Sequence, residues 1–424
     1  MLSFKVYTLG CKVNIYESEL VISLLSDNGY KLTSDKADIV IINTCTVTNV
    51  SDSKSKKIIN KARKENEGAI IVVMGCYSQL KHNEVDADII IGNKDKSQIV
   101  SLLDEYLINK KKIKRIYDLQ KVGFENMQIK NFSAHTRAFV KIQDGCDAYC
   151  TYCIIPYVRG NIRSKTIKDV VNEITNLVNL GYKEIILSGI HTGKYGRDIN
   201  TSLECLLRSI IKIPNLFRIR ISSIEINELT SSLLDLISNS DIIAKHLHIP
   251  LQSGSDSILL AMNRKYDTTF FLNKITEIRK KIPNISITTD LIVGFPGETD
   301  ILFKETLSFL NKVKFTKIHV FGYSKREGTV ASCMNNQVNS DIKKQRVKEV
   351  IKLSAEYELK FYNSNIGKTY DIVVIKHNNI VEGFTTNYIP VIVNENVNTD
   401  IVSVKLEKVK KNKVVGKAIE VCYE

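Results

Sequence analysis

The sequence predicts an α/β protein in three parts: an open parallel α/β sheet, then a partial α/β barrel, then a small all-β barrel. Short apolar runs rich in β-branched residues alternate with polar, helix-like stretches through residues 1–118. About six further strand–helix units follow in residues 136–362. Residues 363–424 are rich in β-forming residues and have little helix potential. A chain of 424 residues is long enough for several separate cores.

Composition narrows the class of protein. Hydrophobic residues make up 43% of the chain and charged residues 25%, as in soluble globular proteins. No apolar stretch approaches the length of a membrane span, and the N-terminus has the pattern of a strand and not of a signal peptide, so we expect a cytoplasmic protein with no membrane partner. The formal net charge of +14 favours an anionic partner such as nucleic acid, although a solubilising surface is the alternative.

The first part carries cysteines at its strand ends. Its predicted strands are Phe4–Leu9, Ile39–Ile42, Ile70–Met74 and Asp88–Ile91. Within three residues of the first three strands come Cys11, Cys45 and Cys76. One free cysteine can simply pack as a small hydrophobic residue. Because ligands bind at the carboxyl ends of strands in open α/β sheets, the repeated placement predicts that these three converge on one site. Residues 119–135 follow the basic run 110–115 and are predicted to be a linker.

The second part has the pattern of a barrel that is open on one side. Its predicted strands are Ala138–Ile142, Glu184–Ser188, Arg218–Ile221, His246–Pro250, Ser286–Val293 and Lys317–Phe321. Helical patterns lie between them, such as 167–180, which stops before Gly181 as a helix C-terminus should. In such barrels the chemistry lies at the carboxyl ends of the strands.

The third part predicts a small barrel of the oligonucleotide-binding kind. Its predicted strands are Tyr370–Ile375, Glu382–Thr386, Ile389–Val393, Ile401–Leu406 and Val414–Val421. A local basic run consists of Lys405, Lys408, Lys410, Lys411 and Lys413. This run is either a nucleic-acid contact or a solvated turn.

Cys146, Cys150 and Cys153 form a CxxxCxxC triplet in the loop after the first barrel strand. A closed zinc site needs four ligands, and no fourth cysteine or histidine lies close by in the sequence. Three thiolates on a 4Fe–4S cluster leave one iron open to a cofactor or substrate. The aromatic Tyr152 directly before the third cysteine adds to the specificity of the pattern. Three further cysteines show no ligand spacing and are predicted to be packing residues: Cys205, Cys333 and Cys422.

The motif CDAYCTYC at 146–153 is similar to the CxxxCxΦC motif of the radical S-adenosylmethionine superfamily. The surrounding segments, DGCDAYCTYCIIPYVRGNIRSK, RISSIEINEL, HLHIPLQSGS, TTDLIVGFPGET and HVFGYSKREGT, resemble those of the methylthiotransferases. TLGCKVNIYESE (8–19) and NTCTVTNVSDSKSKK (43–57) resemble the bacterial enzymes that act on N6-threonylcarbamoyladenosine in tRNA. The order of domains also matches, with a C-terminal barrel called TRAM in that family.

The resemblance implies two 4Fe–4S clusters and S-adenosyl-L-methionine as cofactors. Cys146, Cys150 and Cys153 would hold the radical-generating cluster, and Cys11, Cys45 and Cys76 an auxiliary cluster that carries the transferable sulfur. One S-adenosylmethionine would supply a methyl group and a second a 5′-deoxyadenosyl radical, which removes hydrogen from adenine C2 so that a methylthio group can replace it. The implied partners are a tRNA anticodon stem-loop, a reductase or flavodoxin-type electron donor, and a sulfur donor.

Other residues at strand ends are candidates for binding the cofactor, with turn or packing roles as the alternative. Besides Tyr152 they are Ser188, Gly189, Arg220, Ser222, Gln252 and Asp290, and weaker candidates are Ser223, Glu225 and Gly294. Arg159 and Arg163 follow the triplet and are expected to meet the cofactor, RNA phosphate or a salt-bridge partner.

A basic stretch follows Cys45: Lys54, Lys56, Lys57, Lys61, Arg63 and Lys64. It predicts a helix with Asp52 or Ser53 as its N-cap, and either contact with the tRNA backbone or a solvated helix.

Two alternatives remain open at this point. The first is a methylthiotransferase acting on isopentenyladenosine in tRNA or on a ribosomal-protein aspartate. The second is a non-catalytic RNA-binding protein whose six clustered cysteines carry zinc.

Overall fold

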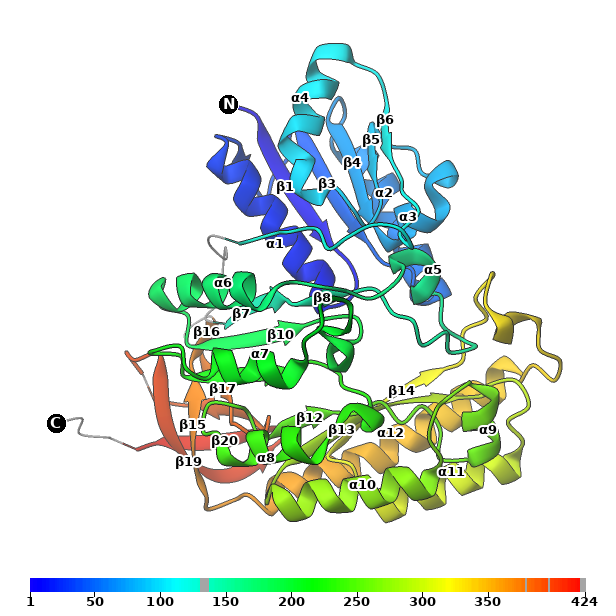
Figure 1. The fold of residues 1–424 in the computed structure, drawn as a ribbon, viewed down its shortest axis with the longest axis vertical. Coiled ribbons are helices and arrows are strands. Elements are labelled where there is room, and N and C mark those ends of the chain that lie inside the picture. Colours follow the sequence, from blue (N-terminus) through cyan, green and yellow to red (C-terminus); the bar gives the residue numbers. More distant parts are fainter. Residues whose placement is uncertain (130–136, 378–379, 396, 420–424) are drawn as a thin grey trace.

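The structure of the protein, a computed structural model, describes residues 1–129, 137–377, 380–395 and 397–419. Figure 1 shows the N-terminal sheet above the partial barrel, with the C-terminal strands against one end of that barrel. None of the helices in these described ranges is both long and apolar enough to cross a membrane.

The N-terminal part is a three-layer α/β domain, as predicted. Its six strands are all parallel and run in the order β2-β1-β3-β4-β5-β6. The elements are β1 Ser3–Thr8, α1 Lys12–Asp27, β2 Lys31–Leu32, β3 Ile39–Thr44, α2 Asn49–Glu65, β4 Ile70–Gly75, α3 Cys76–Lys81, η1 His82–Glu84, β5 Ile89–Ile91, η2 Lys96–Gln98, α4 Ile99–Asn109 and β6 Ile113–Arg115. Alternate residues of β3 pack into different cores, Ile39 and Ile41 into one and Val40 and Ile42 into the other, because helices cover both faces of the sheet.

Two details of this domain differ from the predictions. The short edge strands β2 and β6 were not predicted, and β6 lies inside the basic run that precedes the predicted linker. The prediction of Asp52 or Ser53 as a helix N-cap is wrong: α2 begins at Asn49, and the Thr48 side chain accepts a hydrogen bond from the Ser51 backbone. Asp52 instead lies in the first turn, where it accepts a hydrogen bond from the Thr46 hydroxyl at 2.6 Å.

The segment predicted as a linker has neither helix nor strand from residue 119 to 129. Leu119, Met127 and Ile129 are nevertheless buried, and the Leu119 carbonyl accepts a hydrogen bond from Arg163 at 3.1 Å. This stretch is therefore packed against the barrel. Residues 130–135 of the predicted linker lie outside the described residues.

The central part is a partial barrel of six parallel strands with helices on its outer side. The strand elements are β7 Arg137–Lys141, β10 Glu184–Ser188, β11 Arg218–Ile221, β12 His246–His248, β13 Ser286–Val293 and β14 Lys317–Gly322, with the short pair β8 Gln143–Asp144 and β9 Arg163–Ser164. The helices are α5 Ile155–Arg159, α6 Ile167–Asn179, η3 Thr192–Lys194, η4 Arg197–Ile199, α7 Leu203–Ile210, η5 Ile226–Glu228, α8 Ser231–Asn239, α9 Asp256–Ala261, α10 Thr268–Lys281, α11 Asp300–Val313, η6 Val330–Cys333 and α12 Ser340–Asn363.

All six barrel strands are where the sequence predicts them. They pair as β7-β10-β11 and β12-β13-β14, and the two halves meet through backbone hydrogen bonds from Ile219 to Ile242 and from Ala244 to Ile219. The predicted helix over 167–180 is α6, which ends where Gly181 adopts φ +99°.

The C-terminal part is a curled β half-barrel of six strands, where the sequence predicts five. The elements are β15 Thr369–Val373, β16 Ile375–His377, β17 Ile380–Phe384, β18 Pro390–Val393, β19 Ile401–Lys410 and β20 Lys413–Ala418, in the order β15-β19-β20-β18-β17-β16. The predicted strand over 370–375 is divided because β15 pairs with β19 whereas β16 pairs with β17 at the other end of the sheet. The sheet curls until Gly383 packs on Val373, whose carbonyl oxygen would lie 2.7 Å from a Cβ at that glycine.

The prediction that the spare cysteines are packing residues is wrong for two of the three. Cys205 and Cys333 are both exposed, Cys205 on α7 and Cys333 at the end of η6. Cys422 lies outside the described residues.

Candidate active site between two cysteine triplets

The structure brings the three N-terminal cysteines together. Cys11 precedes α1, Cys45 follows β3 and Cys76 begins α3 directly after β4, so all three lie at the carboxyl ends of neighbouring parallel strands. Burial raises the pKa of Cys45, and the nearby Cys76 and Cys11 raise it further by repulsion between thiolates. Gly10 permits this approach, since it adopts φ +106° and a Cβ there would lie 3.0 Å from the Cβ of Cys45.

Hydrogen-bond donors surround the sulfur of Cys76. The Nε of Arg159 lies 3.3 Å from this sulfur and the Nδ2 of Asn93 lies 3.4 Å from it. Cys76 and Cys45 are buried, whereas Cys11 is exposed. The triplet is therefore enclosed on one side by donors and open on the other.

The second triplet lies in the loop between β8 and α5. The backbone N–H of Cys153 bonds to the Cys150 carbonyl at 2.9 Å, which closes a tight turn. Burial raises the pKa of Cys153 to about 12, and repulsion from Cys150 and Cys146 contributes. Arg264 Nη1 lies 3.3 Å from the sulfur of Cys150, so a cation faces this triplet as well.

His191 lies beside the first cysteine of this loop. Its Nδ1 is 3.3 Å from the sulfur of Cys146, and its Nε2 is 2.7 Å from the carboxylate of Glu228. Burial alone would lower the pKa of His191, but the contacts with Cys146 and Glu228 outweigh it and raise the pKa to about 9. A cavity of about 230 Å³ opens here, with Cys150, His191 and Arg264 in its wall.

A second cavity, of about 250 Å³, lies between the barrel, where Cys153 lines it, and the segment of the N-terminal domain that follows Cys45. One wall consists of Val47 and Thr48, which follow Cys45 in the N-terminal domain. The opposite wall belongs to the partial barrel: Tyr152, Cys153, Ile154, Ile155, Gln252, Asp290, Ile292, Phe321, Gly322, Tyr323, Ser324 and Arg326. Most of this lining is apolar or aromatic, and the buried Oη of Tyr323 and Nε of Arg326 have no hydrogen-bond partner among the described residues.

Three of the predicted cofactor-binding residues border this cavity. Tyr152 directly precedes Cys153 in the wall. Gln252 adopts φ +69° and pairs with Leu291 in an isolated bridge, and its backbone N–H bonds to the Asp290 carbonyl at 2.9 Å. The carboxylate of Asp290 lies 3.2 Å from the Nε2 of His248.

Three other predicted residues lie at the ends of β10 and β11. Ser188 is buried, and its hydroxyl lies 3.4 Å from the Val140 carbonyl. Gly189 is closely packed, since a Cβ there would lie 3.0 Å from the Oε1 of Gln143. The hydroxyl of Ser222 is buried and has no hydrogen-bond partner in the described part of the chain, which leaves it free for a ligand.

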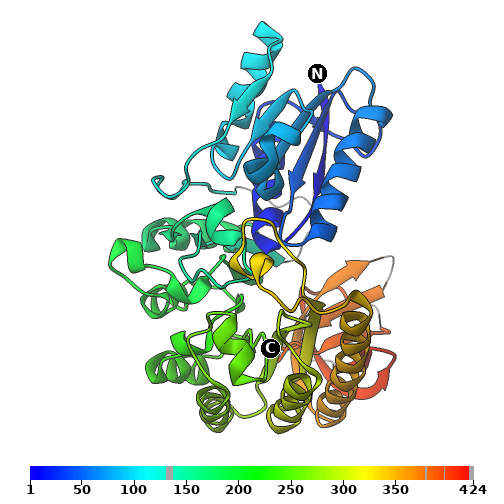
Figure 2. The same ribbon diagram turned by 90° about the vertical axis from the view of Figure 1, so that its right-hand side faces the viewer.

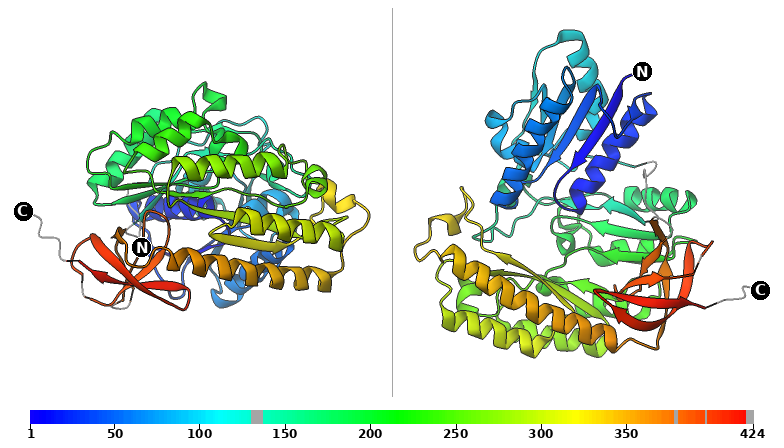
Figure 3. Two further views of the ribbon diagram at one scale, coloured as in Figure 1. Left: turned by 90° about the horizontal axis from the view of Figure 1, so that it is seen from below. Right: turned by 180° about the vertical axis from the view of Figure 1, so that it is seen from behind.

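Arg220, also predicted to contact the cofactor, contacts the C-terminal half-barrel. Its Nε donates to Glu184 at 2.9 Å, its Nη2 donates to the Thr385 carbonyl at 2.8 Å, and its guanidinium stacks on Tyr388. Arg218 on the same strand donates to the carbonyls of Phe384 and Asp371. Figure 3 shows the red and orange C-terminal strands at this end of the barrel. We therefore leave Arg220 out of the cofactor site.

A buried cluster of charges joins the N-terminal domain to the barrel. Glu17 on α1 is fully buried and pairs with Lys96 of its own domain and with Lys141 and Arg159 of the barrel. Burial would raise the pKa of Glu17, but these three cations hold it well below the usual value. Arg159 and Lys141 likewise lower the pKa of Asp144, which Arg163 also contacts. The weaker candidates Arg159 and Arg163 are thus engaged by acidic partners.

A second contact between the domains lies at the cavity. Arg326 of the barrel donates to Asp52 at 2.7 Å, to Asn49 at 2.8 Å and to Thr46 at 2.7 Å, all in the segment that follows Cys45. In Figure 2 the yellow segment that carries Arg326 reaches up to the blue N-terminal domain. Sequence reasoning did not single out Arg326 or Glu17, although both lie in quoted segments, because their partners are far away in the sequence.

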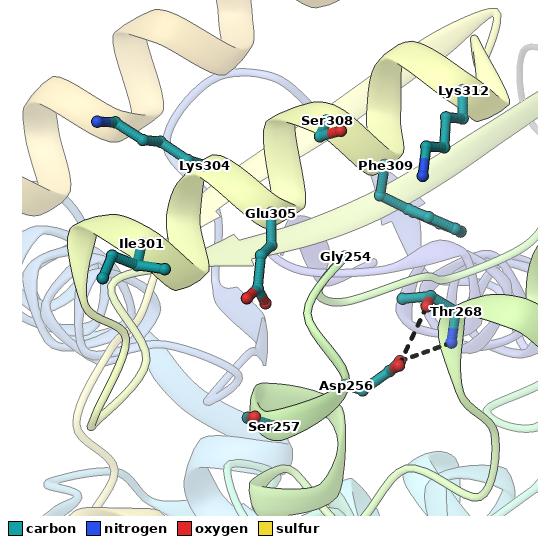
Figure 4. A pocket seen from close by; sticks show the side chains of 10 residues that line it. All are labelled: Gly254, Asp256, Ser257, Thr268, Ile301, Lys304, Glu305, Ser308, Phe309 and Lys312. Carbon is teal, nitrogen blue, oxygen red and sulfur yellow. Dashed lines mark hydrogen bonds between the residues drawn. The ribbon is translucent and has the colours of Figure 1, made fainter.

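A larger cavity lies away from both triplets. It measures about 670 Å³ and is formed by α9, α10 and α11 on the outer side of the barrel (Figure 4). Asp256 accepts hydrogen bonds from Thr268, and Glu305 accepts one from Ser255 at 2.6 Å. No cysteine lines it, and its acidic groups already have partners within the protein. The chemistry therefore belongs to the smaller cavities beside the triplets.

The basic helix α2 begins four residues after Cys45. Lys56, Lys61 and Arg63 pair with acidic residues of the same domain. Lys54, Lys57 and Lys64 are exposed. The paired residues are typical of a solvated helix, and the exposed lysines are available for the expected contact with the tRNA backbone.

In the described ranges, no group of three or more His, Cys, Asp and Glu side chains is arranged to hold a single metal ion. A 4Fe–4S cluster is larger, and its cysteines bind different iron atoms. Two groups of three thiols, each with cationic or amide donors at a sulfur, fit such clusters.

Comparison with known proteins gives consistent matches. Residues 3–92 match the family described as "Uncharacterized protein family UPF0004", and residues 140–310 match the "Radical SAM superfamily". The threonylcarbamoyladenosine tRNA methylthiotransferase of Bacillus subtilis is 39% identical over 95% of this chain and 93% of its own length. The tRNA-2-methylthio-N(6)-dimethylallyladenosine synthase of Carboxydothermus hydrogenoformans is 35% identical over 88% of both chains.

Solved structures agree on the fold. A radical S-adenosylmethionine methyltransferase from Kitasatospora setae superposes with a TM-score of 0.54 over 76% of this chain and 74% of its own. The two sequences are 12% identical, so this likeness concerns the fold alone.

Proposed function

This chain belongs to the radical S-adenosylmethionine tRNA methylthiotransferases, and from that membership we propose that it converts N6-threonylcarbamoyladenosine next to the tRNA anticodon to its 2-methylthio derivative. The observation that carries the proposal is the cavity, here called the shared cavity, whose wall includes Cys153 of the barrel triplet and the residues Val47 and Thr48, which follow Cys45 of the N-terminal triplet. A base held there would lie beside Cys153 and beside the loop that follows Cys45, as a reaction that needs a radical and a sulfur requires.

The radical-generating cluster is held by Cys146, Cys150 and Cys153. S-adenosylmethionine bound at its open iron supplies the 5′-deoxyadenosyl radical, which side-chain acid–base chemistry could not replace at an adenine C–H bond. Ser188, Gly189 and Ser222 would line one side of the bound cofactor, and the hydroxyl of Ser222, which has no partner in the described part of the chain, would be free to bond to it. Tyr152, Gln252 and Asp290 border the other side.

The auxiliary cluster is held by Cys11, Cys45 and Cys76 and carries the sulfur that is transferred. The exposed Cys11 leaves this cluster open to a sulfur donor, while Cys45 and Cys76 are buried, Cys76 against Ile154 and Val158 of the barrel. A reductase or flavodoxin-type protein supplies the electrons. The apolar lining of the shared cavity excludes water, which protects the radical.

The tRNA binds across the domains. The target base leaves the anticodon loop, where single-stranded bases are free to unstack, and enters the cavity with the aromatic side chains of Tyr152, Phe321 and Tyr323 in its wall. The exposed Lys54, Lys57 and Lys64 of α2 contact the backbone phosphates.

Two measurements test this function. In the first, the nucleosides of tRNA from cells with and without the gene are analysed by mass spectrometry. We expect the methylthio-threonylcarbamoyl nucleoside to be lost in the cells without the gene. Persistence of that nucleoside, with loss of the methylthio-isopentenyl form, would transfer the proposal to the other tRNA substrate. The purified, reconstituted enzyme is then offered anticodon stem-loops with either modification and a ribosomal-protein peptide, and only the threonylcarbamoyl stem-loop should gain a methylthio group.

Metal analysis of the anaerobically purified protein tests the non-catalytic alternative. We expect about eight iron and eight sulfide per chain for two 4Fe–4S clusters. Zinc in place of iron would refute the enzymatic proposal.

A further inference from the structure

We propose that Arg159 is a positioning residue that sets the reduction potential of the auxiliary cluster through its hydrogen bond to Cys76. This inference rests on the proposed function, because it takes Cys76 to be a ligand of that cluster. Arg159 lies six residues after Cys153, on the short helix α5, yet its side chain reaches the other triplet.

The placement of this side chain is well defined. Arg159 is fully buried, and its Nε donates to the sulfur of Cys76 at 3.3 Å. Its Nη1 donates to Glu17 at 3.1 Å and to Asp144 at 3.0 Å, and its Nη2 donates to Asn14 at 2.8 Å. Because these partners hold both Nη1 and Nη2, the planar guanidinium presents its Nε–H to Cys76 in one orientation.

The physical effect follows from charge. A hydrogen bond from a cation stabilises negative charge on a thiolate ligand, and hydrogen bonds to the sulfurs are one of the factors that set the potential of an Fe–S cluster. The reduced cluster carries one more electron than the oxidised one, so the Arg159 contact favours reduction. Loss of this contact should therefore lower the midpoint potential.

The carboxylates around Arg159 supply an opposing effect. Glu17 is fully buried and shares Arg159 with the sulfur of Cys76. When Glu17 is replaced by the isosteric, neutral Gln, more of the cation's charge is left to act on the cluster. The midpoint potential should then rise, opposite in sign to the change expected for loss of the Arg159 hydrogen bond.

The experiment uses the full chain with Cys146→Ala, Cys150→Ala and Cys153→Ala, so that only the auxiliary cluster is present. Its midpoint potential is measured by redox titration followed by electron paramagnetic resonance. Arg159→Lys keeps the buried charge and removes the Nε–H donor. We expect the ratio of reduced to oxidised cluster at a fixed potential to fall about tenfold, a downward shift of about 59 mV for one electron. Glu17→Gln should shift the midpoint upward.

Arg279→Lys is the matched control, because Arg279 also donates from its guanidinium to partners within the protein, the carbonyls of Val313 and Lys314, and has no contact with either triplet. It should leave the auxiliary potential unchanged. An Arg159→Lys protein that holds the cluster at the parent potential overturns the inference. If Arg159→Lys does not hold the cluster, Glu17→Gln decides, and an unchanged or lowered potential overturns it. A parent protein that forms no cluster refutes the auxiliary cluster of the proposed function, a different failure.

Discussion

Arg326 should couple cleavage of S-adenosylmethionine to formation of product. Its guanidinium is buried and bonds to Thr46, Asn49 and Asp52, which hold the loop after Cys45 against the barrel. Arg326→Met keeps much of the side-chain volume and removes all three bonds. Breaking a buried ion pair costs about 3–5 kcal/mol, and partial exposure of Asp52, whose side chain is 19% exposed, reduces this to about 2–3 kcal/mol.

A loss of this size changes the equilibrium between docked and undocked loop by about 30- to 140-fold, at 1.4 kcal/mol for each factor of ten. The loop after Cys45 forms one wall of the shared cavity. Undocking of this loop should therefore move the auxiliary cluster away from the position that it needs relative to the base. The radical-generating triplet lies wholly within the barrel and is untouched. We therefore expect 5′-deoxyadenosine to form at close to the normal rate while methylthiolated product falls at least tenfold.

The assay measures 5′-deoxyadenosine and methylthiolated anticodon stem-loop in the same anaerobic reaction, with iron content determined for each variant. Arg279→Met is the matched control: Arg279 donates to the carbonyls of Val313 and Lys314 and contacts neither triplet nor the shared cavity. It should keep the ratio of product to 5′-deoxyadenosine. If Arg326→Met holds both clusters and also keeps that ratio, the reasoning about the docked loop is refuted.

Three further predictions follow from the geometry. Cys150→Ala should abolish both 5′-deoxyadenosine and product, whereas Cys45→Ala should lose product and retain some 5′-deoxyadenosine; normal methylthiolation by Cys45→Ala would refute the auxiliary assignment. Glu184→Ala leaves the buried guanidiniums of Arg218 and Arg220, and the partly exposed one of Arg137, without their carboxylate and should cost about 3–5 kcal/mol, seen in denaturant unfolding and as earlier proteolytic release of the C-terminal half-barrel; an unchanged transition would contradict this. In the cluster-free protein, alkylation followed by mass spectrometry should find Cys153 slower than the exposed Cys205, with a rate that rises about tenfold per pH unit below its pKa of about 12; a plateau near pH 8 would disprove the raised pKa.

The sequence predicted the fold wherever a local pattern determines it. Buried parallel strands such as β3 and β4 are continuous β-branched runs, so their positions could be read directly from the sequence. The edge strands could not be predicted in this way, because β2 has only two residues and β6 carries the charged Lys114 and Arg115. The division between β15 and β16 could not be predicted either, because a change of pairing partner does not alter the local sequence pattern of the strand.

The cysteines could be predicted for a similar reason, since their position relative to strand ends is a local property. The residues that connect the domains could not. Glu17 lies in a helix next to charged and polar neighbours, and nothing in that segment shows that Arg159 and Lys141, over 120 positions away, will surround it. Arg220 is a related case: its place near a strand end suggested a cofactor contact, and nothing in the sequence indicated that its donors also bond to Glu184 and to the C-terminal half-barrel.

The arrangement of the domains also bears on where the substrate is recognised. The segment around Cys11 resembles one subgroup of enzymes most closely, yet its residues Asn14 and Glu17 face the buried junction with Arg159 and not the shared cavity. The cavity wall comes instead from the loop after Cys45 and from the barrel, which contributes residues of the triplet loop, of β13 and of the segment 321–326 together with Gln252. In that cavity Thr48 lies on the N-terminal wall, whereas Ser324 and the Oη of Tyr323, which has no hydrogen-bond partner among the described residues, lie on the barrel wall. On the proposed function, contacts that distinguish one N6 substituent from another are therefore expected in the wall of this cavity and not in the segment around Cys11.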